Sequence, residues 1–282
     1  MKRVILKILK YFVIGAVAIV LVSIGIDATD NFDNFSGSIF KNLLFGKPKG
    51  PCPEEMVFVS SEKGGFCIDK YEASADPNCP SPDPASQADT RANIDKQDCR
   101  PISKSGVLPW TYISQTQAAV ACAKAGKRLP TDSEWYYAAL GTPDRASDWT
   151  ADDCQVAKNW PSQPGLAGSG KNCYSPNGAF DMIGNVWEWV RGEIVDGAFN
   201  GKQLPLSGYI KEVNIDGIPI ATDEQIPDPN HNQDYIWIKN KETRGMARGG
   251  YWDNKEEAGQ YSVYLVSPPS FVGDGVGFRC VK

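Results

Sequence analysis

Apolar residues recur at helical spacing in two short segments of the chain. In SQTQAAVACAKAGKR, Ser114 is a favoured N-cap residue, small apolar residues follow at helical positions, and Gly126 is a typical C-terminal stop. In TDSEWYYAAL, Thr131 is the N-cap and Glu134, three residues later, completes a capping box. The pattern therefore predicts two consecutive helices.

The remaining pattern is typical of short strands and loops. Pro53 to Val59 and Phe66 to Tyr71 are predicted strands, with a turn at Lys63–Gly65. Asp76 to Arg100 is rich in Pro, Asp, Ser and Asn, and is predicted to be a surface loop. After Ala146 the periodicity fades, and the Gly, Pro and Asn content predicts short strands at most. A doubly wound fold and a β-sandwich are both excluded by this pattern.

The N-terminus predicts a membrane anchor. Several Lys and Arg residues precede an uncharged apolar run from Tyr11 to Ile26, and aspartates follow it. Lysine stems can extend this run to the length that spans a bilayer, and the charge asymmetry places the start inside and the rest outside. We expect an anchor helix at 1–30, a tether at 31–51 and a globular domain at 52–282. A cleaved signal peptide is the alternative, and either interpretation exports the domain.

The amino-acid composition argues against some classes of partner and metal site. A net charge of -5 and a pI near 5.1 argue against nucleic acid as a partner, because nucleic acid needs a basic face. Eight cysteines in an exported chain predict disulfides. The only histidine is His231, so a zinc site of the Cys/His type is not expected.

Distinct sequence blocks occur together in a fixed order: AVACAKAGKRLPTDSEWYYAALG, SPNGAFDMIGNVWEWV and RGGYWDN followed by GFRC. In this order they resemble the formylglycine-generating enzyme, or sulfatase-modifying factor, family. The resemblance covers Cys52 to Lys282. It implies an α+β domain with a variant of the C-type-lectin fold and little regular secondary structure.

The family resemblance implies one disulfide, because the helix cysteine of the family bonds the cysteine of the terminal GFRC. Here these are Cys122 and Cys280, and the bridge would join the first helix to the last strand. The other pairs are assigned by proximity along the chain, since sequence does not fix connectivity. They are Cys52 with Cys67, Cys79 with Cys99, and Cys154 with Cys173.

The segment GNVWEW predicts a calcium site. In an extended segment, Trp187 and Trp189 face one side and Glu188 the other. Oxygen ligands suit Ca²⁺. The family binds calcium at positions that match the side chains of Asp181 and Glu188 and the carbonyls of Gly184 and Val186. Alternatively, Glu188 is a buried, hydrogen-bonded structural carboxylate.

The same resemblance argues against copper. Formylglycine-generating enzymes hold copper through two cysteines after RGG and use it to oxidise a substrate cysteine. Those positions fall at Asn254 and Gly259, and neither residue can replace the thiolates that hold Cu(I). The only cysteine in the segment, Cys280, matches the structural one. We therefore expect no copper and no copper oxidase activity.

The C-terminal segment 248–280 predicts a binding surface instead. Its pattern W-x-N, A-G, Y-S-V-Y-L, P-P-S and G-F-R-C resembles lectin-fold proteins whose variable region is diversified by retroelements. Polar and apolar side chains alternate around Tyr264, which in a strand places the polar groups on one face and the apolar groups on the other. An ordinary exposed strand is the alternative. The candidate ligand-binding residues are Tyr251, Asp253, Asn254, Lys255, Glu256, Gln260, Ser262, Tyr264, Ser267, Ser270 and Phe271.

These observations predict an exported, membrane-anchored, non-catalytic domain that binds an extracytoplasmic protein or glycan through segment 248–280. Two alternatives stay open. One is an active oxidoreductase of the same superfamily with different chemistry. The other is a structural subunit of an envelope assembly.

Overall fold

The structure, a computed structural model, describes residues 50–61 and 64–282. Pro51–Lys282 form one compact unit. The predicted anchor at 1–30 and most of the tether lie outside the described residues. Within the described part of the chain, none of the helices has both the length and the apolarity needed to cross a bilayer.

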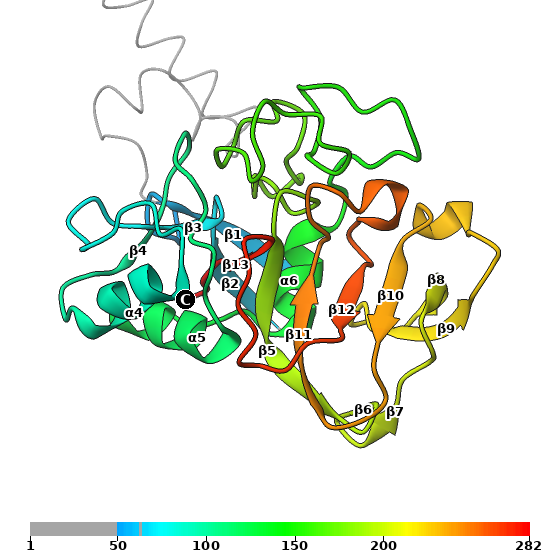
Figure 1. Cartoon of the computed structure of the whole chain (residues 1–282). Coiled ribbons are helices and arrows are strands. Elements are labelled where there is room, and N and C mark those ends of the chain that lie inside the picture. The colour runs from blue at the N-terminus through cyan, green and yellow to red at the C-terminus, as the bar shows by residue number, and fades with distance from the viewer. Residues whose placement is uncertain (1–49, 62–63) are drawn as a thin grey trace, which may run out of the picture. The chain divides into compact units, whose positions relative to one another are not determined.

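The unit is α+β, with three short helices packed around sheets (Figure 1). The largest sheet has the strand order β7-β6-β5-β11-β12-β10-β8-β9, and β13 pairs in parallel with β5. Its strands are β5 (Trp187–Val195), β6 (Ala198–Phe199), β7 (Lys202–Gln203), β8 (Gly208–Val213), β9 (Pro219–Asp223), β10 (Tyr235–Ile238), β11 (Thr243–Arg248), β12 (Val263–Leu265) and β13 (Val276–Phe278). Two further pairs are β1 (Met56–Ser61) with β2 (Gly64–Asp69), and β3 (Ala73–Ala75) with β4 (Pro101–Ser103). Short 3-10 turns occur at Pro229–His231 and Lys255–Glu257.

Both predicted helices and the predicted hairpin are confirmed. Helix α5 (Gln115–Lys124) and helix α6 (Asp132–Ala139) each begin with a complete capping box, at Ser114 and Thr131 respectively. Reciprocal bonds in such a box satisfy two N-terminal N–H groups, which is why the sequence signature located both starts. β1 and β2 pair antiparallel as expected.

The expected loop at 76–100 contains a helix, so this prediction was wrong. Helix α4 (Gln87–Asp95) begins after Ser86, whose side chain accepts from the N–H of Asp89. Its buried residues are polar: Thr90 accepts a hydrogen bond from the Trp110 indole at 3.0 Å, and Asn93 bonds to Ser81. A helix held by polar contacts has no apolar stripe, so periodicity could not reveal it.

The second half is also more regular than expected. β5 alone has 9 residues, and the strands after Ala146 form the largest sheet. Its register is irregular, with shifts between Gly245 and Ala247 and along β8 and β9. Bulges and short strands interrupt the period-two pattern on which a strand prediction depends.

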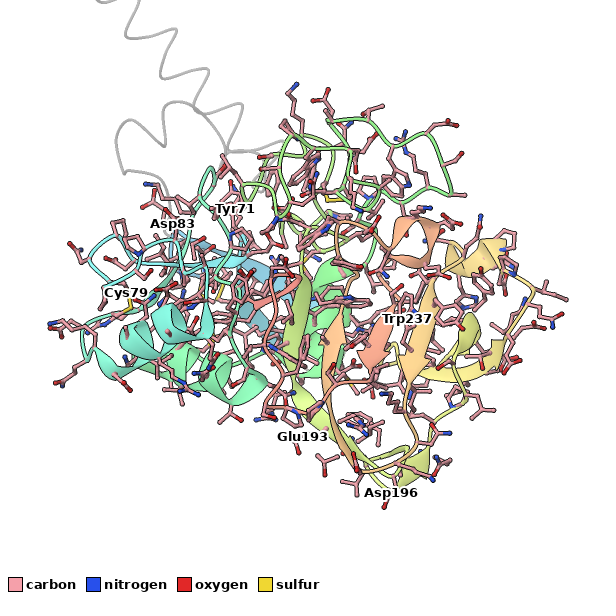
Figure 2. All side chains as sticks on the ribbon, in the orientation of Figure 1. Tyr71, Cys79, Asp83, Glu193, Asp196 and Trp237 are labelled. Carbon is pink, nitrogen blue, oxygen red and sulfur yellow. A yellow bond between two sulfur atoms is a disulfide. The ribbon has the colours of Figure 1, made fainter. Side chains whose placement is uncertain are left out.

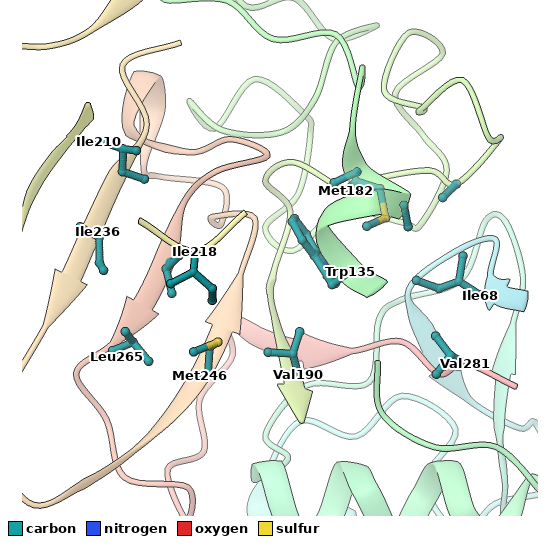
Figure 3. Packing of buried hydrophobic residues seen from close by; sticks show 14 of the residues in the cluster. Ile68, Trp135, Met182, Val190, Ile210, Ile218, Ile236, Met246, Leu265 and Val281 are labelled. Carbon is teal, nitrogen blue, oxygen red and sulfur yellow. The ribbon is translucent and has the colours of Figure 1, made fainter. Parts of the chain in front are cut away.

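The sheet has a core on each side. One core packs β-strand residues against α6 and the β1–β2 hairpin, and Figure 3 shows it extending from Ile236 and Leu265, past Trp135, to Ile68 and Val281. The other core lies against α5 and contains several aromatic residues of β5, β10, β12 and β13. The binding pocket described below opens on this second side.

All four predicted disulfides are present: Cys52–Cys67, Cys79–Cys99, Cys122–Cys280 and Cys154–Cys173. Cys122–Cys280 joins α5 to the segment after β13 across a sequence separation of 158 residues. In the chain-entropy model, a loop of this length stabilises the fold by about 4–5 kcal/mol.

A buried ion pair lies where the elements meet. The Arg279 guanidinium donates to both Glu188 oxygens at 2.6 and 2.7 Å, and the Trp135 indole donates to the same carboxylate at 2.7 Å. Arg279 also donates to the carbonyls of Asp69 and Phe180. Arg279 is fully buried and Glu188 nearly so, which makes the pair depend on protein partners rather than on water.

Asp144 and Asp234 belong to a second buried cluster. Among the described residues, this cluster does not contain one cation for each carboxyl group. Burial, and then the charge of Asp144, raises the pKa of Asp234 well above its usual range. Burial likewise raises the pKa of Asp144 to about 8, although hydrogen bonds from Arg145 and Asn232 oppose the shift. These carboxyls are therefore stabilised in the protonated form.

We predict that Glu188→Gln lowers the free energy of unfolding by about 3–5 kcal/mol, because it leaves the Arg279 charge buried without a counterion. Urea unfolding followed by circular dichroism measures the loss. The matched control is Asp152→Asn, which breaks the exposed Lys171–Asp152 pair of 2.7 Å and should cost about 1 kcal/mol or less. Equal losses in the two variants would contradict the prediction.

We also predict a pH-dependent stability. Asp144 has a folded pKa of about 8 against an ordinary value of 3.8, so its stabilising contribution is full below about pH 4 and is lost as the pH rises through 8. Asp144→Asn should therefore reduce the difference in melting temperature between pH 5 and pH 8.5. The measurement is thermal unfolding at both pH values, and an unchanged difference would refute the assignment.

Candidate ligand-binding site

A pocket of about 370 Å³ opens on the α5 side of the sheet. Its size lies at the lower end of the range for small-molecule sites. It is formed by β5, β10 and β12 together with the loops after β11 and before β13. The lining residues are Trp187, Trp189, Trp237, Tyr251, Asn254, Tyr264, Phe271, Gly273, Asp274, Gly275 and Val276.

The strand register explains why aromatic residues gather here. Phe278, Trp189, Ala247, Tyr264 and Trp237 face one another in turn across β13, β5, β11, β12 and β10. Residues opposite one another on neighbouring strands share a face of the sheet, so this register forms a row of rings interrupted by one small residue. Figure 2 labels Trp237 in the part of the sheet where this row ends.

A second aromatic layer completes the pocket. The Trp187 ring lies 5.4 Å from the Trp237 ring at an interplanar angle of 84°. It lies 5.5 Å from the Tyr264 ring at 37°. Because β5 is extended, Trp187 and Trp189 share a face while Glu188 turns to the opposite side, as the alternation predicted.

Glycines and an asparagine shape the loop after β11. Gly249 and Gly250 have φ values of 94° and 89°, a region that side chains disfavour. The chain then reverses, and Asn254 Oδ1 accepts the N–H of Tyr251 at 2.9 Å. This bond fixes the turn that carries Tyr251 into the pocket wall.

The electrostatics of the pocket are negative. Asp274 is the only charged residue among the described lining residues, and it is exposed. Burial, and then the charges of Asp253 and Asp274, raise the pKa of Tyr251, while Lys158 opposes them. Lys158 is itself paired with Asp253 at 2.8 Å, so its charge is largely compensated.

The structure brings only part of the predicted ligand-binding set together. Tyr251, Asn254, Tyr264 and Phe271 line the pocket. Four others have exposed or half-buried side chains outside its lining: Asp253, Lys255, Glu256 and Ser270.

The remaining three predicted residues are buried. Gln260 and Ser262 precede β12, where the alternation of a strand does not apply, and Ser267 follows it. The side-chain Oε1 of Gln260 accepts the N–H of Gly141 at 2.9 Å. Ser262 donates to the carbonyl of Glu257, and Ser267 bonds to the Tyr264 hydroxyl at 2.8 Å.

Sequence reasoning missed five lining side chains: Trp187, Trp189, Trp237, Asp274 and Val276. The alternation in GNVWEW placed the two tryptophans of β5 on one face, but they were not included among the candidate ligand-binding residues. The alternation YIWI around Trp237 could have identified an aromatic residue with one face free. No local signal connects Asp274 to the pocket, since its position depends on the loop that precedes β13.

The predicted calcium ligands lie around the buried ion pair. Both Glu188 oxygens accept from Arg279, so this carboxylate does not fit a calcium ligand in the observed arrangement. Asp181 accepts from the N–H of Gly168, and its other oxygen is buried without a hydrogen-bond partner. Across residues 50–61 and 64–282, no group of three or more His, Cys, Asp or Glu side chains is arranged to hold a metal ion. Calcium at these positions therefore stays a prediction, and we derive no role for it.

The two copper positions of the resembling enzymes are occupied by other contacts. Asn254 holds the Tyr251 turn. A Cβ atom on Gly259 would lie 1.9 Å from Asp234 Oδ1, so the Asp234 carboxylate occupies the space of any side chain there. These residues do not fit a copper site, because neither position offers a thiolate.

A larger cavity of about 640 Å³ lies elsewhere, near the start of α6. Its walls are mostly polar and include Asp132, Arg191, Glu193 and Asp216. None of the predicted site residues lines it. We assign the candidate site to the smaller pocket because it combines aromatic walls with a single charged group, as ligand sites usually do.

Comparison with known proteins identifies a family. Residues 59–282 match the sulfatase-modifying factor enzyme 1-like domain. Over 100 residues the chain is 33% identical to inactive C-alpha-formylglycine-generating enzyme 2 of Bos taurus, covering 29% of this chain and 32% of that protein. Over 91 residues it is 37% identical to the formylglycine-generating enzyme of Mycobacterium tuberculosis, covering 27% and 30%. The aligned stretch thus spans about a third of the length of these relatives.

Solved structures with a similar chain path include the Major Tropism Determinant I1 variant, with a TM-score of 0.43 and 17% identity over 83% of this chain and 54% of that one. Treponema denticola variable protein 1 has a TM-score of 0.44 and 15% identity over 77% of this chain and 84% of that one. The family match covers well over half of the sequence. This protein therefore belongs to the sulfatase-modifying factor enzyme 1-like domain family.

Proposed function

We propose that this protein is an exported, membrane-anchored member of the family that binds a protein or glycan ligand without catalysing a reaction on it. The observation that carries the proposal is the aromatic pocket, because four residues of segment 248–280 that the sequence singled out converge in it. Aromatic and amide side chains form contacts with partners at a low entropic cost.

The state of the cysteines supports a non-catalytic role. The chain has 8 cysteines, and all of them lie in disulfides. A copper oxidase of the resembling type needs two thiolates, and Asn254 and Gly259 stand at their positions. An oxidoreductase with different chemistry is the rival, and stoichiometric copper loading with conversion of a thiol peptide to an aldehyde would establish it.

The disulfides also support the proposed location. Disulfides persist in oxidising compartments, so four of them indicate an extracytoplasmic environment. The basic, apolar N-terminal sequence supports anchoring. A structural role in an envelope assembly is the other alternative, and a stable complex that survives pocket mutations would favour it.

We predict that alanine at Tyr251, Tyr264 and Phe271 together weakens ligand capture at least about tenfold, because buried aromatic anchors dominate interface energies. The full chain in lipid nanodiscs is tested against a glycan array and against extracytoplasmic protein extract. The control is Ser162→Ala, an exposed position outside the pocket lining and outside the predicted ligand-binding set. Capture that is equal in the triple variant and the wild type would contradict the proposal.

We further predict that Gly259 has no space for a side chain. Gly259→Ala should lower the free energy of unfolding by about 1–3 kcal/mol, as overpacking does. In an Asp234→Ala background the same substitution should cost much less, because the blocking carboxylate is gone. The four proteins of this cycle are compared by urea unfolding. An equal cost in both backgrounds would show that Asp234 is not the obstacle.

A further inference from the structure

We propose that the aromatic pocket recognises an organic cation, an alkylated ammonium group carried by the ligand. This inference rests on the proposed function and names the chemistry of its site. The supporting features are the arrangement of the rings, the sign of the local charge and the prior engagement of the polar groups.

The rings form walls in more than one plane. Trp187 and Trp237 stand nearly perpendicular, at 84°, with Tyr264 tilted against the first of them. Tyr251 and Phe271 contribute further aromatic lining from two different loops. An ammonium group is attracted to the negative face of an aromatic ring, and several rings around one volume add their contributions.

The rings combine burial with access. Trp187 is only 7% exposed, whereas Phe271 is 40% exposed. The exposure of the lining rings therefore increases from the inner wall of the pocket to its rim. Trp237, Tyr251 and Tyr264 are half-buried. A cation there would lose part of its hydration, which strengthens its attraction to the rings.

The charge near the pocket has the required sign. Asp274 lines the pocket, and its charge acts on the Tyr251 hydroxyl together with that of Asp253. The described lining residues include no Lys, Arg or His. A carboxylate beside aromatic rings attracts a cation and repels an anion, so a phosphate or carboxylate ligand is disfavoured.

Two polar atoms of the pocket are already engaged, which favours a cation over a sugar ring as the primary occupant. Asn254 Oδ1 already accepts the Tyr251 N–H, and the Tyr264 hydroxyl already bonds to Ser267. A sugar needs several free donors and acceptors at fixed positions, whereas an alkylated ammonium group needs only ring faces and a nearby negative charge.

The test compares choline with its neutral isostere, 3,3-dimethylbutan-1-ol, on the full chain in nanodiscs, using tryptophan fluorescence and isothermal titration. We expect choline to bind about tenfold more tightly than the isostere. Salt should weaken the binding of choline but not that of the isostere. Equal binding of the two probes, or no binding of choline, would overturn the cation inference.

Single substitutions test whether choline binds in the aromatic pocket. Asp274→Asn should weaken choline binding about threefold and leave the isostere unchanged, and Trp237→Ala should weaken both. The control is Asp83→Asn, an exposed carboxylate that Figure 2 places on the other side of the domain from Trp237. An equal loss in the Asp274 and Asp83 variants would refute the role of the pocket.

The capture experiment on the triple alanine variant decides the proposed function independently of these probes. If that variant loses its ligand while choline fails to bind, the pocket is a binding site and the cation inference is wrong. If choline binds but the triple variant captures its ligand normally, the pocket holds cations and the proposed function is wrong.

Discussion

The Arg279 guanidinium is the contact on which the fold depends most. It bonds to Glu188 on β5, to the carbonyl of Asp69 on β2 and to the carbonyl of Phe180 shortly before β5, so one side chain joins the C-terminal segment to two regions that are far away in sequence. All of these bonds are made in a dry interior, where an unpartnered charge is strongly unfavourable. Trp135 adds the first turn of α6 to the same carboxylate. The group is therefore a junction of the sheet, the hairpin and a helix.

This junction also determines the pocket on the opposite side of β5. With Glu188 turned toward Arg279, the period-two geometry of the strand obliges Trp187 and Trp189 to face the other way. The ion pair and the aromatic wall are consequently two results of one strand orientation. Polar burial on one face of β5 specifies an aromatic wall on the other.

The sequence allowed the local features to be predicted well. The capping boxes located α5 and α6 because the cap residues bond to their own helix, and the β1–β2 hairpin followed from its turn. All four disulfide pairs were predicted, one from the family resemblance and the others because each pair is close along the chain. Helix α4 was missed because its buried contacts are polar.

The site was predictable only in part, for a physical reason. Tyr251, Tyr264 and Phe271 lie in one segment and could be chosen from residue type. Trp237 enters the site through the parallel pairing of β10 with β12, which is a long-range contact that no local pattern encodes. Gln260 and Ser262 were placed on the surface by parity, but the strand begins only at Val263, so the parity did not apply to them.

The position of the last strand has a consequence for how the chain acquires its structure. β13 lies beside β5, and Val281 pairs with both Ile68 and Arg128. The segments that are synthesised first therefore pair with segments that are synthesised last. Pairing between residues so far apart in sequence is slow. A nascent chain that ends before Arg279 has neither its central guanidinium nor the partner of Cys122. Completion of the domain must then wait until the segment from β13 to Val281 has left the ribosome, and until that moment the early segments need protection from aggregation.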